Sequence, residues 1–146
     1  MYRTIVVGTD CSPTAEHAVA KAAQLAKMTD AKLHIVSAYG ESVNALAAVA
    51  GATTALAAEW PDAAIADHRN RVDATARRLR LEGIEVEAHV ESGSAAAMLV
   101  AVAEAVGADL LVVGDRGLKG IRGLLASVPS RVTHRACLDV LVVHTT

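Results

Sequence analysis

Residues 84–113 read IEVEAHVESGSAAAMLVAVAEAVGADLLVV and contain one strand–helix–strand unit. Apolar and polar residues alternate from Ile84 to Glu91, which predicts a strand with one polar face or a strand at a sheet edge. An alanine-rich helix is expected from Ser94 to Val106, with Gly107 closing it. The stretch from Asp109 to Val113 is almost entirely apolar, as a strand buried on both faces should be.

The same alternation of strands and helices continues along the rest of the chain. Further strands are expected at 4–8, 32–38 and 139–143, and further helices at 13–28, 62–81 and 127–135. Residues 40–61 are less regular, and we interpret them as an insertion with a possible helix at 42–58. Right-handed crossovers at this spacing predict a doubly wound α/β fold, with a five-stranded parallel sheet and helices on both faces. We expect one domain over residues 1–146.

Local signals fix the ends of two of these helices. Ser12 is a plausible N-cap, and Pro13 suits the first helical position of the helix that follows. Gly83 is expected just beyond the end of the helix at 62–81.

Composition excludes several classes of function. The formal net charge is −2, and aromatic residues make up 2% of the chain, with no Phe. We therefore expect no nucleic-acid partner. A protein that binds nucleic acid needs positive charge on its surface, and one that binds single strands also needs aromatic side chains on which bases stack. The apolar run at the N-terminus is too short for a secretory or membrane segment. Cys11 and Cys137 form no metal motif and are interpreted as free thiols, which predicts a cytoplasmic protein without membrane association.

Three segments should converge at the carboxyl edge of the sheet, where doubly wound folds bind ligands. They are residues 8–10 after the first strand, residues 37–38 after the second, and the loop that begins at Gly114. Asp10 has a carboxylate suited to a ribose, an adenine or a magnesium ion, but it is equally suited to stabilising the following turn. Ala38 offers only main-chain groups, which suit an adenine edge and also fit a simple strand end.

The loop GDRGLKGIRGLLASVP, residues 114–129, carries the strongest chemical signal. Its repeated glycines allow close approach of main-chain N–H groups to a ligand, and Ser127 begins a helix whose positive end would face the loop. Arg116, Lys119 and Arg122 add positive charge. A long, mobile loop with solvated basic residues is the alternative interpretation, because neither GxxxxGK[ST] nor GxGxxG is present.

The chain contains no recognisable catalytic constellation. No GxSxG nucleophile motif occurs, and the six histidines form no HxH or HxxxH pair, so we interpret them as unclustered and predict no metal site.

With these segments in place, the chain resembles the universal stress protein family over essentially its whole length. The matching stretches are TIVVGTDCS, KLHIVSAY, GADLLVVGDRG and SVPSRVTHRACLDVLVVHTT. Nucleotide-binding members carry a loop of the form Gly-x2-Gly-x9-Gly-Ser/Thr, which Gly114, Gly117 and Ser127 match in part. The loop here is one residue shorter, and Ala126 replaces a glycine.

The resemblance implies a regulatory or stress-response protein that binds ATP, with or without Mg²⁺, or cyclic AMP. The Ser-Val-Pro ending is similar to that of a subgroup that takes cyclic AMP. The resemblance also implies a homodimer through residues 139–143 and no enzymatic activity. A nucleotide-free dimerisation module and a slow ATPase or self-phosphorylating protein remain alternatives. The residues expected to contact the nucleotide are Gly8, Thr9, Asp10, Ala38, Val113, Gly114, Arg116, Gly117, Ser127 and Val128.

Overall fold

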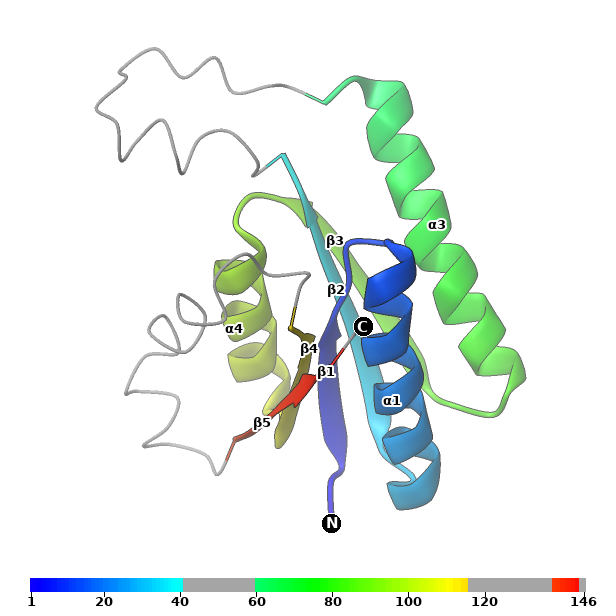
Figure 1. Cartoon of the computed structure of the whole chain (residues 1–146), viewed down its shortest axis with the longest axis vertical. Coiled ribbons are helices and arrows are strands. Elements are labelled where there is room, and N and C mark those ends of the chain that lie inside the picture. The colour runs from blue at the N-terminus through cyan, green and yellow to red at the C-terminus, as the bar shows by residue number, and fades with distance from the viewer. Residues whose placement is uncertain (41–59, 116–137, 145–146) are drawn as a thin grey trace.

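The computed structural model describes residues 1–40, 60–115 and 138–144. Five parallel strands form one sheet in the order β3-β2-β1-β4-β5 (Figure 1). They are β1 (Thr4–Gly8), β2 (Lys32–Tyr39), β3 (Val86–Ser92), β4 (Leu110–Gly114) and β5 (Asp139–Val143). The order reverses between β1 and β4, so the predicted doubly wound α/β fold is confirmed.

The helices in the described residues lie on both faces of this sheet. Helices α1 (Pro13–Thr29) and α3 (Asp62–Leu81) cover one face, and α4 (Ala95–Val106) covers the other (Figure 1). Two apolar cores result, because alternate residues of a strand point to opposite faces. Ile5, Leu33 and Val112 belong to the core under α1 and α3, whereas Val6, Val36 and Leu111 belong to the core under α4.

Capping signals in the sequence set the helix ends as predicted. The Ser12 Oγ accepts a hydrogen bond from the N–H of Ala15 at 3.1 Å, and Pro13 is the first residue of α1. Gly83 follows α3 with a φ of +88°, a left-handed conformation that glycine adopts without strain. Helix α4 begins after Ser94, whose Oγ accepts from Ala97, and ends at Gly107 with a φ of +63°.

Strand β3 begins later than the alternating pattern predicts. The N–H of Ile84 donates to the carbonyl of Leu79 at 3.2 Å and so closes the end of α3 instead of entering the sheet. The strand runs from Val86 to Ser92 and lies at an edge of the sheet, as its alternating pattern indicated. The predicted helices at 42–58 and 127–135 lie outside the described residues.

Candidate functional site

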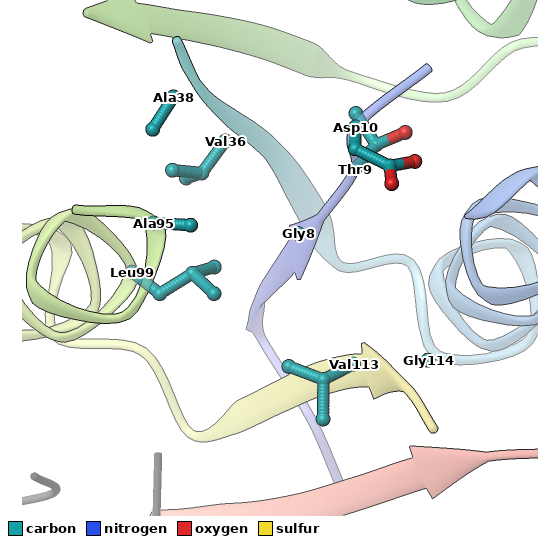
Figure 2. Close-up of a pocket in the computed structure, with 9 residues that line it drawn as sticks. All are labelled: Gly8, Thr9, Asp10, Val36, Ala38, Ala95, Leu99, Val113 and Gly114. Atoms are coloured by element: carbon teal, nitrogen blue, oxygen red, sulfur yellow. The ribbon is translucent and has the colours of Figure 1, made fainter. Parts of the chain in front are cut away.

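A small hollow lies at the carboxyl edge of the sheet, where β1, β2 and β4 end. It is lined by Gly8, Thr9, Asp10, Val36, Ala38, Ala95, Leu99, Val113 and Gly114 (Figure 2). Its volume is about 50 Å³, well below the roughly 300–1,000 Å³ of a pocket that encloses a ligand. The hollow therefore provides a floor that a ligand could rest on rather than a closed site.

Close packing between β1 and α4 forms the centre of this floor. A Cβ atom built on Gly8 would lie 3.0 Å from Cδ1 and 3.2 Å from Cδ2 of Leu99. Leu99 is buried, with 1% of its surface exposed. Gly8 does not have a positive φ, so the close approach of Leu99 is the reason for glycine at this position.

Side chains brace the turn that leaves β1. The Thr9 Oγ1 accepts from the N–H of Cys11 at 3.1 Å, and Asp10 Oδ1 accepts from the N–H of Ser12 at 2.9 Å. Cys11 has a φ of +63°, which is uncommon for a residue other than glycine. Asp10 therefore stabilises the turn before α1, as one of its two predicted roles required, and its carboxylate is exposed beside the hollow.

The main chain of β2 faces the same hollow. The N–H of Thr9 donates to the carbonyl of Val36 at 2.9 Å, and the N–H of Gly93 donates to the carbonyl of Tyr39 at 3.0 Å. Main-chain groups of alternate residues point to opposite sides of a strand. The N–H and C=O of Ala38 therefore point, like those of Val36, toward β1, which has already ended at this level.

Asp115 lies at the same carboxyl edge of the sheet, where the neighbouring strands β4 and β5 end. Its N–H donates to the carbonyl of Val143 at 3.0 Å, and its Oδ2 lies 2.6 Å from Nδ1 of His144. Both groups follow directly after the ends of β4 and β5.

A buried polar pair lies on the opposite face of β2. The Oγ of Ser37 and Nε2 of His68 are 2.8 Å apart, and the two residues are 1% and 6% exposed. Burial lowers the pKa of His68, and Arg71 lowers it further, while Asp10 and Asp67 act in the other direction. The imidazole is therefore held in its neutral form.

Two of the histidines are neighbours, so the interpretation of six unclustered histidines is wrong for this pair. His34 Nδ1 and His89 Nε2 are 2.9 Å apart, and the rings stack with centroids 5.2 Å apart. The residues are 55 positions apart in the sequence, and the parallel pairing of β2 with β3 brings them together. Glu87 lies beside them, with Oε2 3.9 Å from His34 Nδ1.

Comparison with known proteins identifies the family. The model of the universal stress protein family matches residues 1–144. The chain is 41% identical to universal stress protein Rv1636 of Mycobacterium tuberculosis over an alignment of 149 residues, which covers 99% of this chain and 98% of that protein. This chain belongs to the universal stress protein family.

Solved structures of other family members share the fold. A universal stress protein in complex with cAMP is 36% identical and has a TM-score of 0.64, covering 99% of this chain and 98% of its own. Universal stress protein UspA from Lactobacillus plantarum has a TM-score of 0.67 at 22% identity, with 98% of each chain covered. The resemblance inferred from the sequence motifs is therefore confirmed.

The structure brings together all the predicted site residues that it describes. These six residues line the hollow: Gly8, Thr9, Asp10, Ala38, Val113 and Gly114. The other predicted contacts lie outside the described residues: Arg116, Gly117, Ser127 and Val128. Cys11 is a free thiol, as predicted, whereas Cys137 lies outside the described part of the chain.

Sequence reasoning missed three residues that line the hollow, Val36, Ala95 and Leu99. Val36 sits two positions before Ala38 and therefore points to the same face of β2. Ala95 and Leu99 are four positions apart on α4 and lie on one side of the helix. The sequence predicted this helix, but it carried no sign that one side of the helix reaches the end of β1.

None of the helices in the described parts of the chain has the length and apolar character that a membrane span requires.

Proposed function

We propose that this universal stress protein binds an adenine nucleotide, either ATP or cyclic AMP, over the hollow at the carboxyl edge of its sheet. It acts in the cytoplasm as a homodimeric regulatory protein rather than as an enzyme. The observation that carries the proposal is the convergence of Gly8, Asp10, Ala38 and Gly114 on one hollow. The 36% identical family member described in complex with cAMP supports the choice of ligand class.

Each part of the hollow suits one part of a nucleotide. The main-chain N–H and C=O of Ala38 match the donor and acceptor edge of an adenine. The exposed carboxylate of Asp10 suits a ribose hydroxyl, because its Oδ1 is already oriented by the N–H of Ser12. The apolar walls formed by Val36 and Leu99 suit the faces of a base.

The loop that starts at Gly114 is expected to bind the phosphate. Its expected contacts are Arg116, Gly117, Ser127 and Val128. Main-chain N–H groups can stabilise a phosphate by about 1.5–3 kcal/mol each. A single phosphate would tolerate the shortened loop better than a triphosphate, so cyclic AMP is the first ligand to test. ATP would bring Mg²⁺ with it.

Binding is tested by thermal shift and isothermal titration calorimetry with ATP, ADP, AMP and cyclic AMP, each with and without Mg²⁺. At least one of these nucleotides is expected to raise the melting temperature. If none does so at millimolar concentration, the protein is the nucleotide-free module instead. Gly117→Ala combined with Ser127→Ala should abolish the shift.

A second variant tests the described floor. Ala38→Val places two extra methyl groups where the side chain of Ala38 lines the hollow, beside Val36 on the same strand (Figure 2). The matched control is Ala88→Val on β3, whose side chain packs on the core under α1 and α3. We expect loss of nucleotide binding in the first variant only, with both proteins folded by circular dichroism. Equal affinity in the two variants would remove Ala38 from the site.

A further inference from the structure

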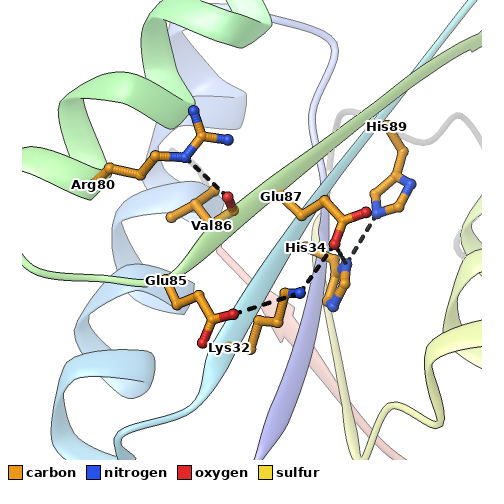
Figure 3. Close-up of polar contacts among 7 residues, drawn as sticks. All are labelled: Lys32, His34, Arg80, Glu85, Val86, Glu87 and His89. Atoms are coloured by element: carbon orange, nitrogen blue, oxygen red, sulfur yellow. Dashed lines mark hydrogen bonds and ion pairs between the residues drawn. The ribbon is translucent and has the colours of Figure 1, made fainter.

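Three potential metal ligands gather on the face of the sheet that carries α4, and none of them lines the nucleotide hollow. Glu87 and His89 are two positions apart on β3 and therefore point to the same face. His34 on β2 is paired in register with Glu87, which brings its ring beside both (Figure 3). One ligand atom from each of these residues lies within 4.8 Å of the others.

The spacing of these atoms suits one metal ion. Zinc binds histidine nitrogen at about 2.0–2.1 Å, so tetrahedral ligands lie roughly 3.3 Å from one another. His34 Nδ1 is 2.9 Å from His89 Nε2 and 3.9 Å from Glu87 Oε2. Small side-chain rotations would bring both distances to the value that a metal requires.

We propose that His34 Nδ1, His89 Nε2 and the Glu87 carboxylate bind one divalent transition-metal ion of the zinc class. Two imidazoles and one carboxylate form a donor set that zinc accepts, with water in the fourth position. Without metal, one ring donates a hydrogen bond to the other. Metal binding requires that hydrogen to move to the outer nitrogen of the same ring, so that both facing nitrogens offer lone pairs.

The three ligands lie between the buried face of the sheet and solvent. His34 is 4% exposed, so its ring is held in place by the packing around it. An ion can reach the ligands from solvent, because the Glu87 side chain is 52% exposed and His89 lines an open groove beside α4.

Lys32 opposes the ion and therefore provides a sharp test. Its Nζ lies 3.0 Å from Glu87 Oε2, where it competes for the carboxylate. It also lies 3.6 Å from Oε1 of Glu85, which offers an alternative partner when Glu87 turns to a metal. Removal of the Lys32 charge should therefore strengthen metal binding, whereas a cluster that serves only as a hydrogen-bonded sheet edge would show no such gain.

The experiment is a calorimetric titration of untagged, nucleotide-free protein with Zn²⁺. We expect one ion per chain, with binding weakened more than about tenfold in His89→Gln and Glu87→Gln. Loss of a residue that only hydrogen-bonds to a metal ligand already costs about 10–100-fold in metal affinity, and loss of a ligand itself should cost at least as much. Lys32→Gln should bind more tightly than wild type. His17→Gln is the matched control, because His17 is exposed on α1 on the other side of the sheet.

Nitrogen-15 spectra of the imidazole rings locate the ion independently. Zinc should shift the facing nitrogens of His34 and His89 and leave His17 unchanged. Positions 87 and 89 are not fully buried, so Glu87→Gln and His89→Gln should remain folded, which circular dichroism can verify. Absence of zinc binding, or binding of equal strength in wild type and His89→Gln, would overturn the proposal.

Discussion

Gly8→Ala tests the packing that forms the floor of the nucleotide site. The added Cβ would lie 3.0 Å from Leu99 Cδ1, closer than ordinary van der Waals contact. Leu99 is buried in the core under α4, together with Val6 and Leu111, and it also lines the hollow. The substitution therefore requires Leu99 to give way by a few tenths of an ångström, either by a shift of α4 or by movement of its side chain toward the hollow.

The expected cost follows from two opposing effects. Overpacking a well-filled core destabilises by about 1–3 kcal/mol. Replacing glycine with alanine at a permitted φ regains about 0.4–1 kcal/mol, because the unfolded chain has fewer conformations to lose. The net loss is at most about 2.6 kcal/mol, and at about 2–4 °C per kcal/mol the melting temperature should fall by up to roughly 10 °C.

A double-mutant cycle with Leu99→Ala isolates the contact. Leu99→Ala alone should destabilise by about 2–5 kcal/mol through loss of buried surface and creation of a cavity. In that background the Cβ of Gly8→Ala has space, so its cost should fall by at least about 0.5 kcal/mol, the lower limit of coupling between residues in contact. Unfolding in urea, followed by circular dichroism, gives all four free energies.

The same variant should weaken nucleotide binding, because Gly8 and Leu99 both line the hollow. Additive costs in the cycle would show that Leu99 does not restrict position 8, and the packing argument would then be wrong. A nucleotide-induced thermal shift of wild-type size in Gly8→Ala would instead show that nucleotide binding does not depend on the packing between Gly8 and Leu99.

Three further predictions concern other parts of the fold. Asp10→Asn should weaken nucleotide binding while leaving the Ser12 contact in place, since an amide oxygen also accepts a hydrogen bond; ATP turnover by wild type that disappears in this variant would favour the enzymatic alternative. His68→Gln should make the free energy of unfolding less sensitive to acid. As the pH falls through about 6.5, a histidine in the unfolded chain takes up a proton, whereas the buried ring of His68 stays neutral because its pKa is lowered. Wild type should therefore lose up to about 1.4 kcal/mol of stability per pH unit below that pH. Urea titrations at pH 7.5 and 5.5 measure this difference, and identical losses in both proteins would exclude His68 as the cause. Val142→Pro should convert a homodimer to monomers. The carbonyl of Val143 bonds toward β4, so the N–H of Val142 points to the open edge of β5, and proline would remove it. Light scattering measures the mass of this variant and of a Val142→Thr control, and a dimeric Val142→Pro protein would contradict the predicted interface.

Local sequence signals predicted the elements of this fold well. Each expected strand and helix in the described residues is present, because periodicity and the capping residues Ser12, Gly83 and Gly107 all act over a few positions. The start of β3 was wrong by two residues, since the N–H of Ile84 serves the end of α3. Boundaries of this kind depend on competition between neighbouring elements for one hydrogen bond.

The candidate site was predictable only where it follows a strand end. Parallel strands bring Gly8, Ala38 and Gly114 to one edge by topology alone. Leu99 was missed because helical spacing shows which side of α4 is buried and not how far along the sheet it reaches. The contact between His34 and His89 was missed because it depends on the register of two strands that are distant in sequence.

The two proposed sites share one strand but should operate independently. His34 and Ala38 are four residues apart on β2, so roughly 13 Å separate their Cα atoms at 3.3 Å per residue, whereas His89 is paired in register with Val36, which lines the hollow. A metal charge would act mainly on the neutral adenine, because the phosphate is assigned to the loop after β4, and β1 separates β4 from β2. Val36 lies between His34 and Ala38, 2% exposed and packed under α4, so the strand has little freedom to move in response to either ligand. Nucleotide affinity should therefore be the same with and without zinc. A zinc-dependent change that His89→Gln abolishes would mean that β2 itself shifts when the metal binds.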